Sequence, residues 1–157
     1  MTDLDRFDRQ LLTLVQQDAA LTAEQLAERV SLSPSAIQRR LKRLREQGVI
    51  TRHVAVLDPA RVGRAMTFIA AVQVESERAD QMTALRGWMA AEPRVQQAFY
   101  VTGEADFILI VTAADAESYE ALMARLLADN PNVRRYTTSV AMNVLKRGLD
   151  VPVPPGD

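Results

Sequence analysis

Hydrophobic residues recur at helical spacing along the first part of the chain. Between residues 4 and 15 they fall mainly three or four positions apart, which predicts a helix with one buried face. Thr22 then stands three residues before Gln25, a capping-box spacing that predicts the start of a second, short helix. We therefore expect the chain to begin with two helices joined by a short connection.

Residues 33–48 carry the start and stop signals of a third helix. Ser33 offers an N-cap hydroxyl, and Pro34 suits the first helical position because an N–H group there would have no helical partner. We expect this helix to run toward Gln47 and to end at Gly48, since glycine readily adopts a positive φ. Residues 49–57 then mix β-branched and polar side chains, which predicts a strand or a short wing.

The hydrophobic period changes in the second half of the chain. The predicted elements are strand 66–74, helix 80–91, strand 95–102, strand 106–112, a helix through 119–127 and strand 133–145. This order is the βαββαβ pattern of a ferredoxin-like domain. The predicted fold class is therefore α+β, with an N-terminal three-helix, winged helix-turn-helix in front of a ferredoxin-like domain.

We expect three segments along the chain: a helix-turn-helix with its wing at 1–60, a ferredoxin-like domain at 61–147 and an extended tail at 148–157. The turn signal Asp58-Pro59 suggests the first boundary, and the prolines of the last ten residues suggest the tail. Apolar residues also fall on the sheet face that the helices leave open. Because a large apolar patch usually marks an interface, we expect at least a homodimer.

Charge is unevenly distributed, although the formal net charge is only −1. Between residues 33 and 52 the basic residues are Arg39, Arg40, Lys42, Arg43, Arg45 and Arg52, and Glu46 is the one acidic residue. A local excess of cations attracts polyanions such as double-stranded DNA. Basic helix faces are often only solvated surface, and it is the three-helix context that favours DNA.

On the third predicted helix, the outward face carries the polar and basic side chains. Residues at its N-terminal end can reach base edges in the major groove, where Gln38 suits adenine and Arg39 suits guanine. Other cations and hydroxyls would contact phosphates. The predicted DNA contacts are Ser33, Ser35, Gln38, Arg39, Lys42, Arg43 and Arg52.

The chain lacks cysteine, which excludes disulfides, thiol nucleophiles and cysteine metal sites. No secretory signal or membrane-spanning stretch is visible, so we expect a soluble, cytoplasmic protein. His53 is the single histidine and falls in the predicted wing, so we expect no metal site. No constellation of catalytic residues is present, and neither an enzyme activity nor a cofactor is predicted.

Several motifs resemble those of Lrp/AsnC-family regulators, over nearly the whole chain. They are residues 4–12 (LDRFDRQLL), 26–30 (LAERV), 32–35 (LSPS), 39–44 (RRLKRL), 48–50 (GVI) and 103–107 (GEADF), together with Met142 and Lys146. The resemblance implies a sequence-specific transcriptional regulator that dimerises through its ferredoxin-like domain. It also implies assembly into octamers or other even-numbered rings, and binding of an amino acid or a related small effector between dimers.

Carried over from the family, the effector contacts would be Tyr100, Gly103, Glu104, Asp106, Thr138, Ser139 and Val140. Asp106 can bind an ammonium group, and hydroxyls with loop N–H groups can hold a carboxylate. Ala105 and Ser139 depart from residues common in the family, which bears on the identity of the ligand. Gly103 and its acidic neighbours are also consistent with a simple solvated turn.

An alternative function remains open at this stage. The same residues would serve an architectural protein that organises DNA as oligomeric rings with little or no effector control. Only a response to small molecules would distinguish this function from that of an effector-responsive regulator.

Overall fold

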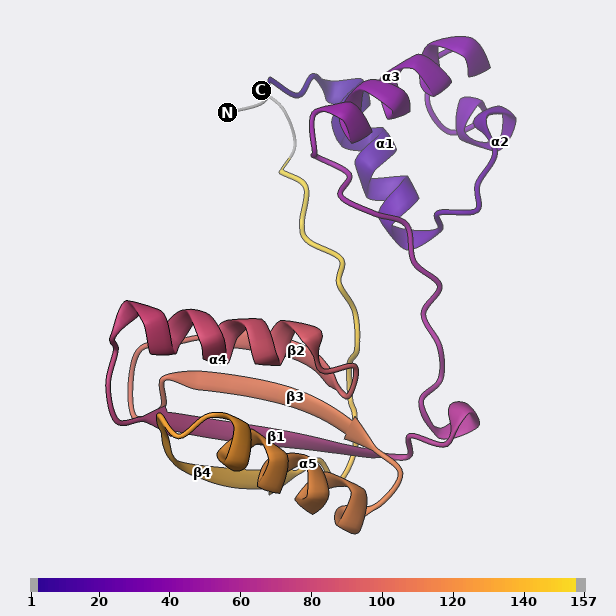
Figure 1. The fold of residues 1–157 in the computed structure, drawn as a ribbon. Coiled ribbons are helices and arrows are strands. Elements are labelled where there is room, and N and C mark those ends of the chain that lie inside the picture. Colours follow the sequence, from indigo (N-terminus) through magenta and orange to yellow (C-terminus); the bar gives the residue numbers. More distant parts are fainter. Residues whose placement is uncertain (1–2, 155–157) are drawn as a thin grey trace. The chain divides into compact units, whose positions relative to one another are not determined.

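The computed structural model describes residues 3–154, which form two compact units. The helical unit contains residues up to 55 together with those from 146 onward, and the sheet unit spans 56–145. Figure 1 shows the elements of each unit. The chain passes from one unit to the other twice, at 55–56 and at 145–146.

Three helices form the helical unit: α1 (Arg6–Gln17), α2 (Ala23–Ala27) and α3 (Pro34–Glu46). The predicted capping signals act as expected. Thr22 and Gln25 form a reciprocal capping box at α2, and the Ser33 hydroxyl accepts a hydrogen bond from the Ala36 N–H at the start of α3. The small core consists of Leu11, Leu26, Val30, Ile37 and Leu41. Its three helices confirm the predicted helix-turn-helix.

Residues 49–57 form no β-strand, so of the strand and the short wing expected after α3, the strand is wrong. Gly48 adopts a φ of 71° and ends α3 as predicted. The following chain exposes Val54, Val56 and Leu57 instead of burying alternate side chains. The helical unit has no strand in its described residues to pair with this segment, and a single strand has no hydrogen-bonded partner to stabilise it.

The sheet unit has the predicted βαββαβ order. Its elements are β1 (Met66–Val74), α4 (Ala79–Ala91), β2 (Val95–Tyr100), β3 (Phe107–Ala113), α5 (Ala116–Asp129) and β4 (Val133–Val140), after a short 3-10 turn at Ala60–Val62. The strands form one antiparallel sheet in the order β2-β3-β1-β4. Its core joins Phe68 and Leu109 of the sheet to Leu85 of α4 and Leu122 of α5. The α+β fold class is confirmed.

Both helices cover the same face of the sheet. Along β1, Phe68, Ala70 and Val72 are buried against the helices, and the alternate residues point to the opposite, open face. The strand registers place the apolar members of that face side by side. They are Ile69, Ala71, Phe99, Ile108 and Ile110, which we call the open-face patch.

Strand β4 ends at Val140, five residues earlier than predicted. Its partner β1 begins at Met66, and the Ala141 N–H donates the last ladder hydrogen bond to the Thr67 carbonyl. The alternating pattern continues to residue 145, but no strand is left to pair with it. Met142 and Leu145 are consequently 97% and 91% exposed.

Candidate nucleic-acid interface and effector site

One side of α3 is buried and the other presents the predicted DNA contacts to solvent. Ile37, Leu41 and Leu44 are buried, which fixes the rotation of the helix about its axis. The positions that follow helical spacing on the outward side are all exposed. They are Ser35, Gln38, Arg39 and Lys42. A single helix thus holds four of the seven predicted contact residues on one face.

Several of the cations on α3 have partners within the helical unit, and others do not. Lys42 lies 3.8 Å from Glu46, one turn away, and both side chains are well exposed. Arg39 forms no ion pair with any residue in the range 3–154. Arg52 is exposed in the irregular segment after α3. Arg39 is therefore the cation on this face that is free to contact DNA without first breaking an ion pair.

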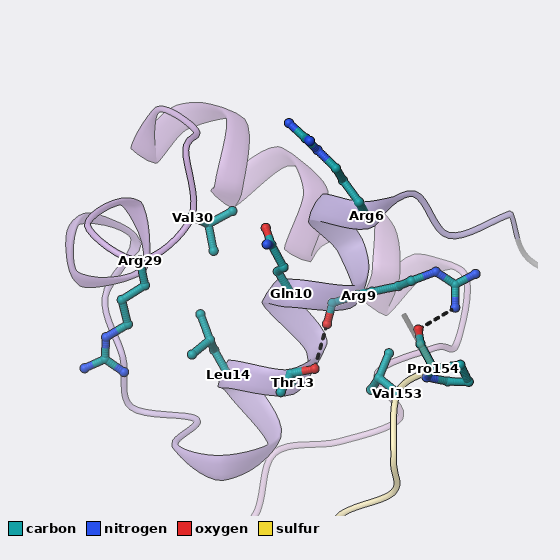
Figure 2. A pocket seen from close by; sticks show the side chains of 9 residues that line it. All are labelled: Arg6, Arg9, Gln10, Thr13, Leu14, Arg29, Val30, Val153 and Pro154. Atoms are coloured by element: carbon teal, nitrogen blue, oxygen red, sulfur yellow. Dashed lines mark hydrogen bonds between the residues drawn. The ribbon is translucent and has the colours of Figure 1, made fainter. Parts of the chain in front are cut away.

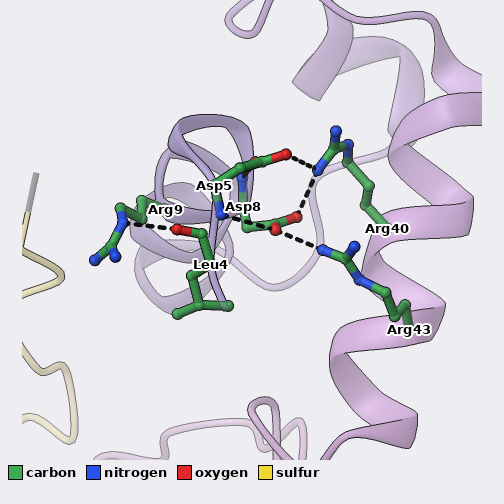
Figure 3. Close-up of polar contacts among 6 residues, drawn as sticks. All are labelled: Leu4, Asp5, Asp8, Arg9, Arg40 and Arg43. Atoms are coloured by element: carbon green, nitrogen blue, oxygen red, sulfur yellow. Dashed lines mark hydrogen bonds and ion pairs between the residues drawn. The ribbon is translucent and has the colours of Figure 1, made fainter. Parts of the chain in front are cut away.

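Two acidic residues at the start of α1 bind two arginines of α3 (Figure 3). The Asp8 carboxylate is 1% exposed and accepts hydrogen bonds from Arg40 Nη1 at 2.9 Å and from Arg43 Nη2 at 2.5 Å. Arg40 also donates to Asp5 at 2.7 Å. Because Asp5 and Asp8 form the capping box of α1, the same two carboxylates cap the start of one helix and hold another.

The ion pair between Asp5 and Arg40 shifts the pKa values of both groups. Burial alone would raise the pKa of Asp5, but hydrogen bonds from the Asp8 N–H and from Arg40 outweigh it and lower the pKa. The hydrogen bond to Asp5 in turn raises the pKa of Arg40. Both groups remain charged near neutral pH. Sequence reasoning missed this network, although the three-residue spacing of Asp5 and Asp8 matches that of Arg40 and Arg43.

Arg43 therefore differs from the other predicted phosphate contacts. Its guanidinium is paired with Asp8, and its side chain is still 44% exposed. A guanidinium has five N–H donors, so one group can bind a carboxylate and a phosphate together. Its contact with DNA stays a prediction.

The loop at 101–106 holds three of the predicted effector contacts, Gly103, Glu104 and Asp106, and directly follows a fourth, Tyr100. Gly103 takes a φ of 121°, which other residues rarely adopt. The Asp106 carboxylate accepts a hydrogen bond from the Val74 N–H at 2.8 Å, and Gln73 donates to the Glu104 carbonyl. The loop is thus attached to the end of β1 by both an acidic side chain and its backbone.

The remaining predicted effector contacts lie further along the sheet. Thr138, Ser139 and Val140 pair with Ala70, Ile69 and Phe68, whereas the loop joins β3 opposite Val72. These positions are two to four residues from Val72 along β1, or about 7–13 Å, and β3 and β4 lie on opposite sides of β1. Within one chain, the predicted effector residues therefore form two groups.

Side-chain direction separates the second group further. The Thr138 hydroxyl lies 2.6 Å from the Tyr119 hydroxyl on the helix-covered face, whereas the adjacent Ser139 faces the open side. Burial raises the pKa of Tyr119, and the hydrogen bond with Thr138 opposes that shift. In the loop group, the ring of Tyr100 contacts that of Phe107 with centroids 5.2 Å apart.

No group of three or more histidine and acidic side chains within residues 3–154 is arranged to hold a metal ion. None of the helices formed by these residues combines the length and apolar content needed to cross a bilayer.

Family models match both units. A model described as Lrp/AsnC ligand binding domain matches residues 67–151, and one described as winged helix-turn-helix DNA-binding matches residues 4–51. The first match alone covers more than half of the chain.

Relatives match over almost their full lengths. An uncharacterized HTH-type transcriptional regulator of Sinorhizobium fredii is 45% identical, with 96% of this chain and 89% of the relative covered. The crystal structure of an AsnC family transcriptional regulator from Agrobacterium tumefaciens has a TM-score of 0.89 at 30% identity, covering 95% of this chain and 97% of that one. A Neisseria meningitidis transcriptional regulator in complex with L-Met gives 0.88 at 27% identity, covering 96% and 97%.

Proposed function

Since the chain belongs to the Lrp/AsnC family and is a DNA-binding transcriptional regulator, we propose that it binds a two-fold operator as a homodimer and responds to an amino acid or a related small molecule in the cytoplasm. The observation that carries this proposal is the outward face of α3, where Gln38, Arg39 and Lys42 are exposed over a buried apolar seam. Two such helices in a dimer would enter successive major-groove segments.

Each predicted DNA contact has a distinct role. Gln38 and Arg39 read base edges near the N-terminal end of α3, because bidentate amide and guanidinium groups match adenine and guanine. Lys42, Arg43 and Arg52 neutralise phosphates. The hydroxyls of Ser33 and Ser35 lie 3.1 Å apart at the start of α3, where the helix dipole favours a phosphate.

Arg39→Ala and Lys42→Ala test this division of roles. We expect Arg39→Ala to weaken operator binding by about 1–3 kcal/mol and to relax base preference at one position. Lys42→Ala should weaken binding to all sequences alike and reduce the salt dependence by about one counterion. Fluorescence anisotropy with operator and random duplexes, over a range of salt concentrations, measures both effects. Unchanged DNA binding in both variants would remove α3 as the recognition helix.

The open-face patch is the surface through which the subunits pair. Ile69 and Phe99 are 39% and 48% exposed, and Ile108 and Ile110 lie between them on the same face. Burying such a patch against its own copy would remove the apolar area from water. Dimers then associate into an octamer or another even-numbered ring.

Ile110→Glu tests the pairing surface. We expect a charge at the centre of the open-face patch to convert dimers to monomers and to weaken operator binding, since the two α3 helices would no longer be linked. Thr83→Glu, on the exposed side of α4, is the matched control and should leave the assembly unchanged. Analytical ultracentrifugation measures both. A dimer that persists at micromolar concentration in Ile110→Glu would place the interface elsewhere.

An amino acid is the effector class that the loop residues suit. The Asp106 carboxylate accepts one hydrogen bond from the Val74 N–H and can accept others from an ammonium group. Ser139 and the loop N–H groups can hold a carboxylate. Because the loop group and the group at 138–140 lie on opposite sides of β1 and are offset by two to four residues along it, a single site would combine residues of different subunits. The L-Met complex of the Neisseria relative supports this ligand class.

Calorimetry with a panel of amino acids tests the effector. We expect at least one amino acid to bind, with Asp106→Ala and Ser139→Ala each weakening it about tenfold or more, because hydrogen bonds to charged groups contribute about 1.5–3 kcal/mol. Glu120→Ala, on the exposed side of α5, is the control. If no amino acid binds and both site variants behave like the unmodified protein, the architectural function is favoured.

A further inference from the structure

The last described residues contact α1, although most of them remain exposed to solvent (Figure 2). The Gln16 side-chain amide contacts the backbone of Val151 twice, donating to its carbonyl at 2.9 Å and accepting from its N–H at 3.1 Å. Arg9 Nη1 donates to the Pro154 carbonyl at 3.0 Å. All three hydrogen bonds connect α1 side chains to the main chain of the segment 151–154.

The two contact points on the helix match the two on the segment. Arg9 and Gln16 are seven residues apart, which is two turns on the same side of α1 and a rise of about 10.5 Å. Residues 151 and 154 in an extended, polyproline-like chain are separated by about 9–10 Å. The segment therefore runs antiparallel to α1 with its first and last residues opposite the two donors.

The apolar lining of a shared cavity and the chemistry of proline favour the same arrangement. Val153 and Pro154 line a cavity of about 490 Å³ with Leu14 of α1 and Val30 beyond α2. Pro152 and Pro154 have a fixed φ, so the segment loses less conformational entropy when it becomes ordered. Neither proline has an N–H that would need a partner.

The segment docks on the side of α1 that is turned away from α3. Arg9 lies on the other side of the start of α1 from Arg40 and Arg43 (Figure 3). Arg9 Nε also donates to the Leu4 carbonyl at 3.1 Å, so one guanidinium joins the segment to the beginning of α1. The contact is compatible with DNA bound to α3.

We propose that the side of α1 formed by Arg9, Thr13 and Gln16 is a docking site for the chain's own segment 151–154. Docking gives the helical unit a second connection to the sheet unit. The first connection is the chain at 55–56, and the second leaves the sheet unit at 145–146 and is held by α1 five residues later. The reach of the DNA-binding unit is then limited by two linkers instead of one.

Hydrogen exchange of the Val151 N–H in the full-length protein tests the contact. We expect Gln16→Ala to accelerate this exchange about tenfold, since the N–H loses its acceptor and the segment opens locally. Gln17→Ala is the matched control, because this exposed neighbour in α1 forms no hydrogen bond with residues 148–154. Exchange at the same rate in the unmodified protein and in Gln16→Ala would overturn the proposal.

Cross-linking identifies which copy of the segment occupies the site. The chain has no cysteine, so Thr13→Cys with Val153→Cys introduces the only pair, and both positions line the cavity. Under mild oxidation we expect a disulfide within one chain. Lys42→Cys with Val153→Cys, which places the first thiol on α3, should form none. A disulfide between two chains would assign the site to the partner subunit's segment, and the absence of any disulfide would exclude docking; either result overturns the proposal.

Discussion

Helix α3, which carries the predicted DNA contacts, and the loop at 101–106, which carries predicted effector contacts, are built in two different ways. On α3, one helix places Gln38, Arg39 and Lys42 on one face, because the helical period alone determines which residues are neighbours. The predicted effector contacts come from the end of β2, from the following loop and from β4, and within one chain they form two separate groups. A DNA-reading surface can therefore be local in sequence, whereas a ligand site between subunits depends on topology and assembly.

The two regions also differ in the contacts that their predicted site residues make within the chain. Arg39 has no ion pair within the described residues, so DNA need not compete for it. Asp106 and Thr138 already make hydrogen bonds inside the sheet unit. Substitutions in the loop should consequently disturb both structure and ligand binding, whereas outward substitutions on α3 should change DNA binding alone.

The largest expected effect is a loss of stability in one unit that leaves the other unit unchanged. Ile37→Ala removes a fully buried side chain from the small core of the helical unit, at a cost of about 2–5 kcal/mol in its free energy of unfolding. We expect operator binding to be lost at the denaturant concentration at which the helical unit unfolds. Trp88 is the single tryptophan and lies in α4, so its fluorescence reports on the sheet unit.

Leu109→Ala is the matched change in the sheet unit, where Leu109 is equally buried. It should shift the Trp88 transition, which Ile37→Ala should leave in place. If both variants move the Trp88 transition by the same amount, the two units unfold together and the contrast between them fails.

A smaller effect is expected from the carboxylates beneath the recognition helix. Asp8→Asn keeps the shape of the side chain but removes the charge that binds Arg40 and Arg43. Hydrogen bonds to charged groups contribute about 1.5–3 kcal/mol, and we expect the free energy of unfolding of the helical unit to fall by that amount. Asp3→Asn removes a charge near the same end of α1 and should have little effect. Chemical denaturation followed by circular dichroism compares the two variants.

Sequence reasoning succeeded for features that depend on neighbouring residues. The Thr22–Gln25 capping box, the Ser33-Pro34 helix start and the positive φ of Gly48 all follow from local chemistry, and each is present. These signals were sufficient for the fold class and for the outward face of α3.

Features that depend on distant partners were missed or misjudged. Residues 49–57 have the composition of a strand but no neighbouring strand, and β4 stops where β1 begins. The ion pairs of Asp8 join residues more than 30 positions apart, and Gln16 binds a residue 135 positions away. Composition does not reveal such pairs, because any acidic residue has several possible cationic partners. The assignment of the effector contacts remains a prediction for the same reason.

The pH dependence of the sheet unit is expected to be modest. Glu92 is buried, and hydrogen bonds from Arg94 together with the charge of Arg125 lower its pKa despite the opposing effect of burial. A carboxyl whose pKa is lower in the folded state stabilises the fold above its unfolded pKa of about 4.3. This stabilisation is lost as the pH falls through the folded pKa.

Glu92→Gln should therefore cost about 1–2 kcal/mol at pH 7 and flatten the loss of stability between about pH 5 and pH 3. Urea denaturation followed by Trp88 fluorescence at each pH measures this, with Glu120→Gln as the exposed control. A slope that is the same in both variants would show that other groups control the acid sensitivity.

The smallest effect concerns the reach of the DNA-binding unit. Releasing the segment 151–154 by Gln16→Ala should make a dimer more tolerant of altered spacing between operator half-sites, because a longer effective linker broadens the range of distances it can span. We expect the affinity ratio between normal and altered spacing to fall by about two- to fivefold. Gln17→Ala should preserve the ratio, and an identical ratio in the two variants would limit the second connection to a structural role.

The two hydrogen bonds between Gln16 and residue 151 involve only main-chain atoms of that residue. Natural variants should therefore accept many side chains at position 151, while an insertion or deletion between 151 and 154 would displace Pro154 from Arg9. Selection on this segment would preserve its length more strictly than its amino-acid sequence. A position-by-position conservation score would rank it as dispensable, even in lineages where the contact is maintained.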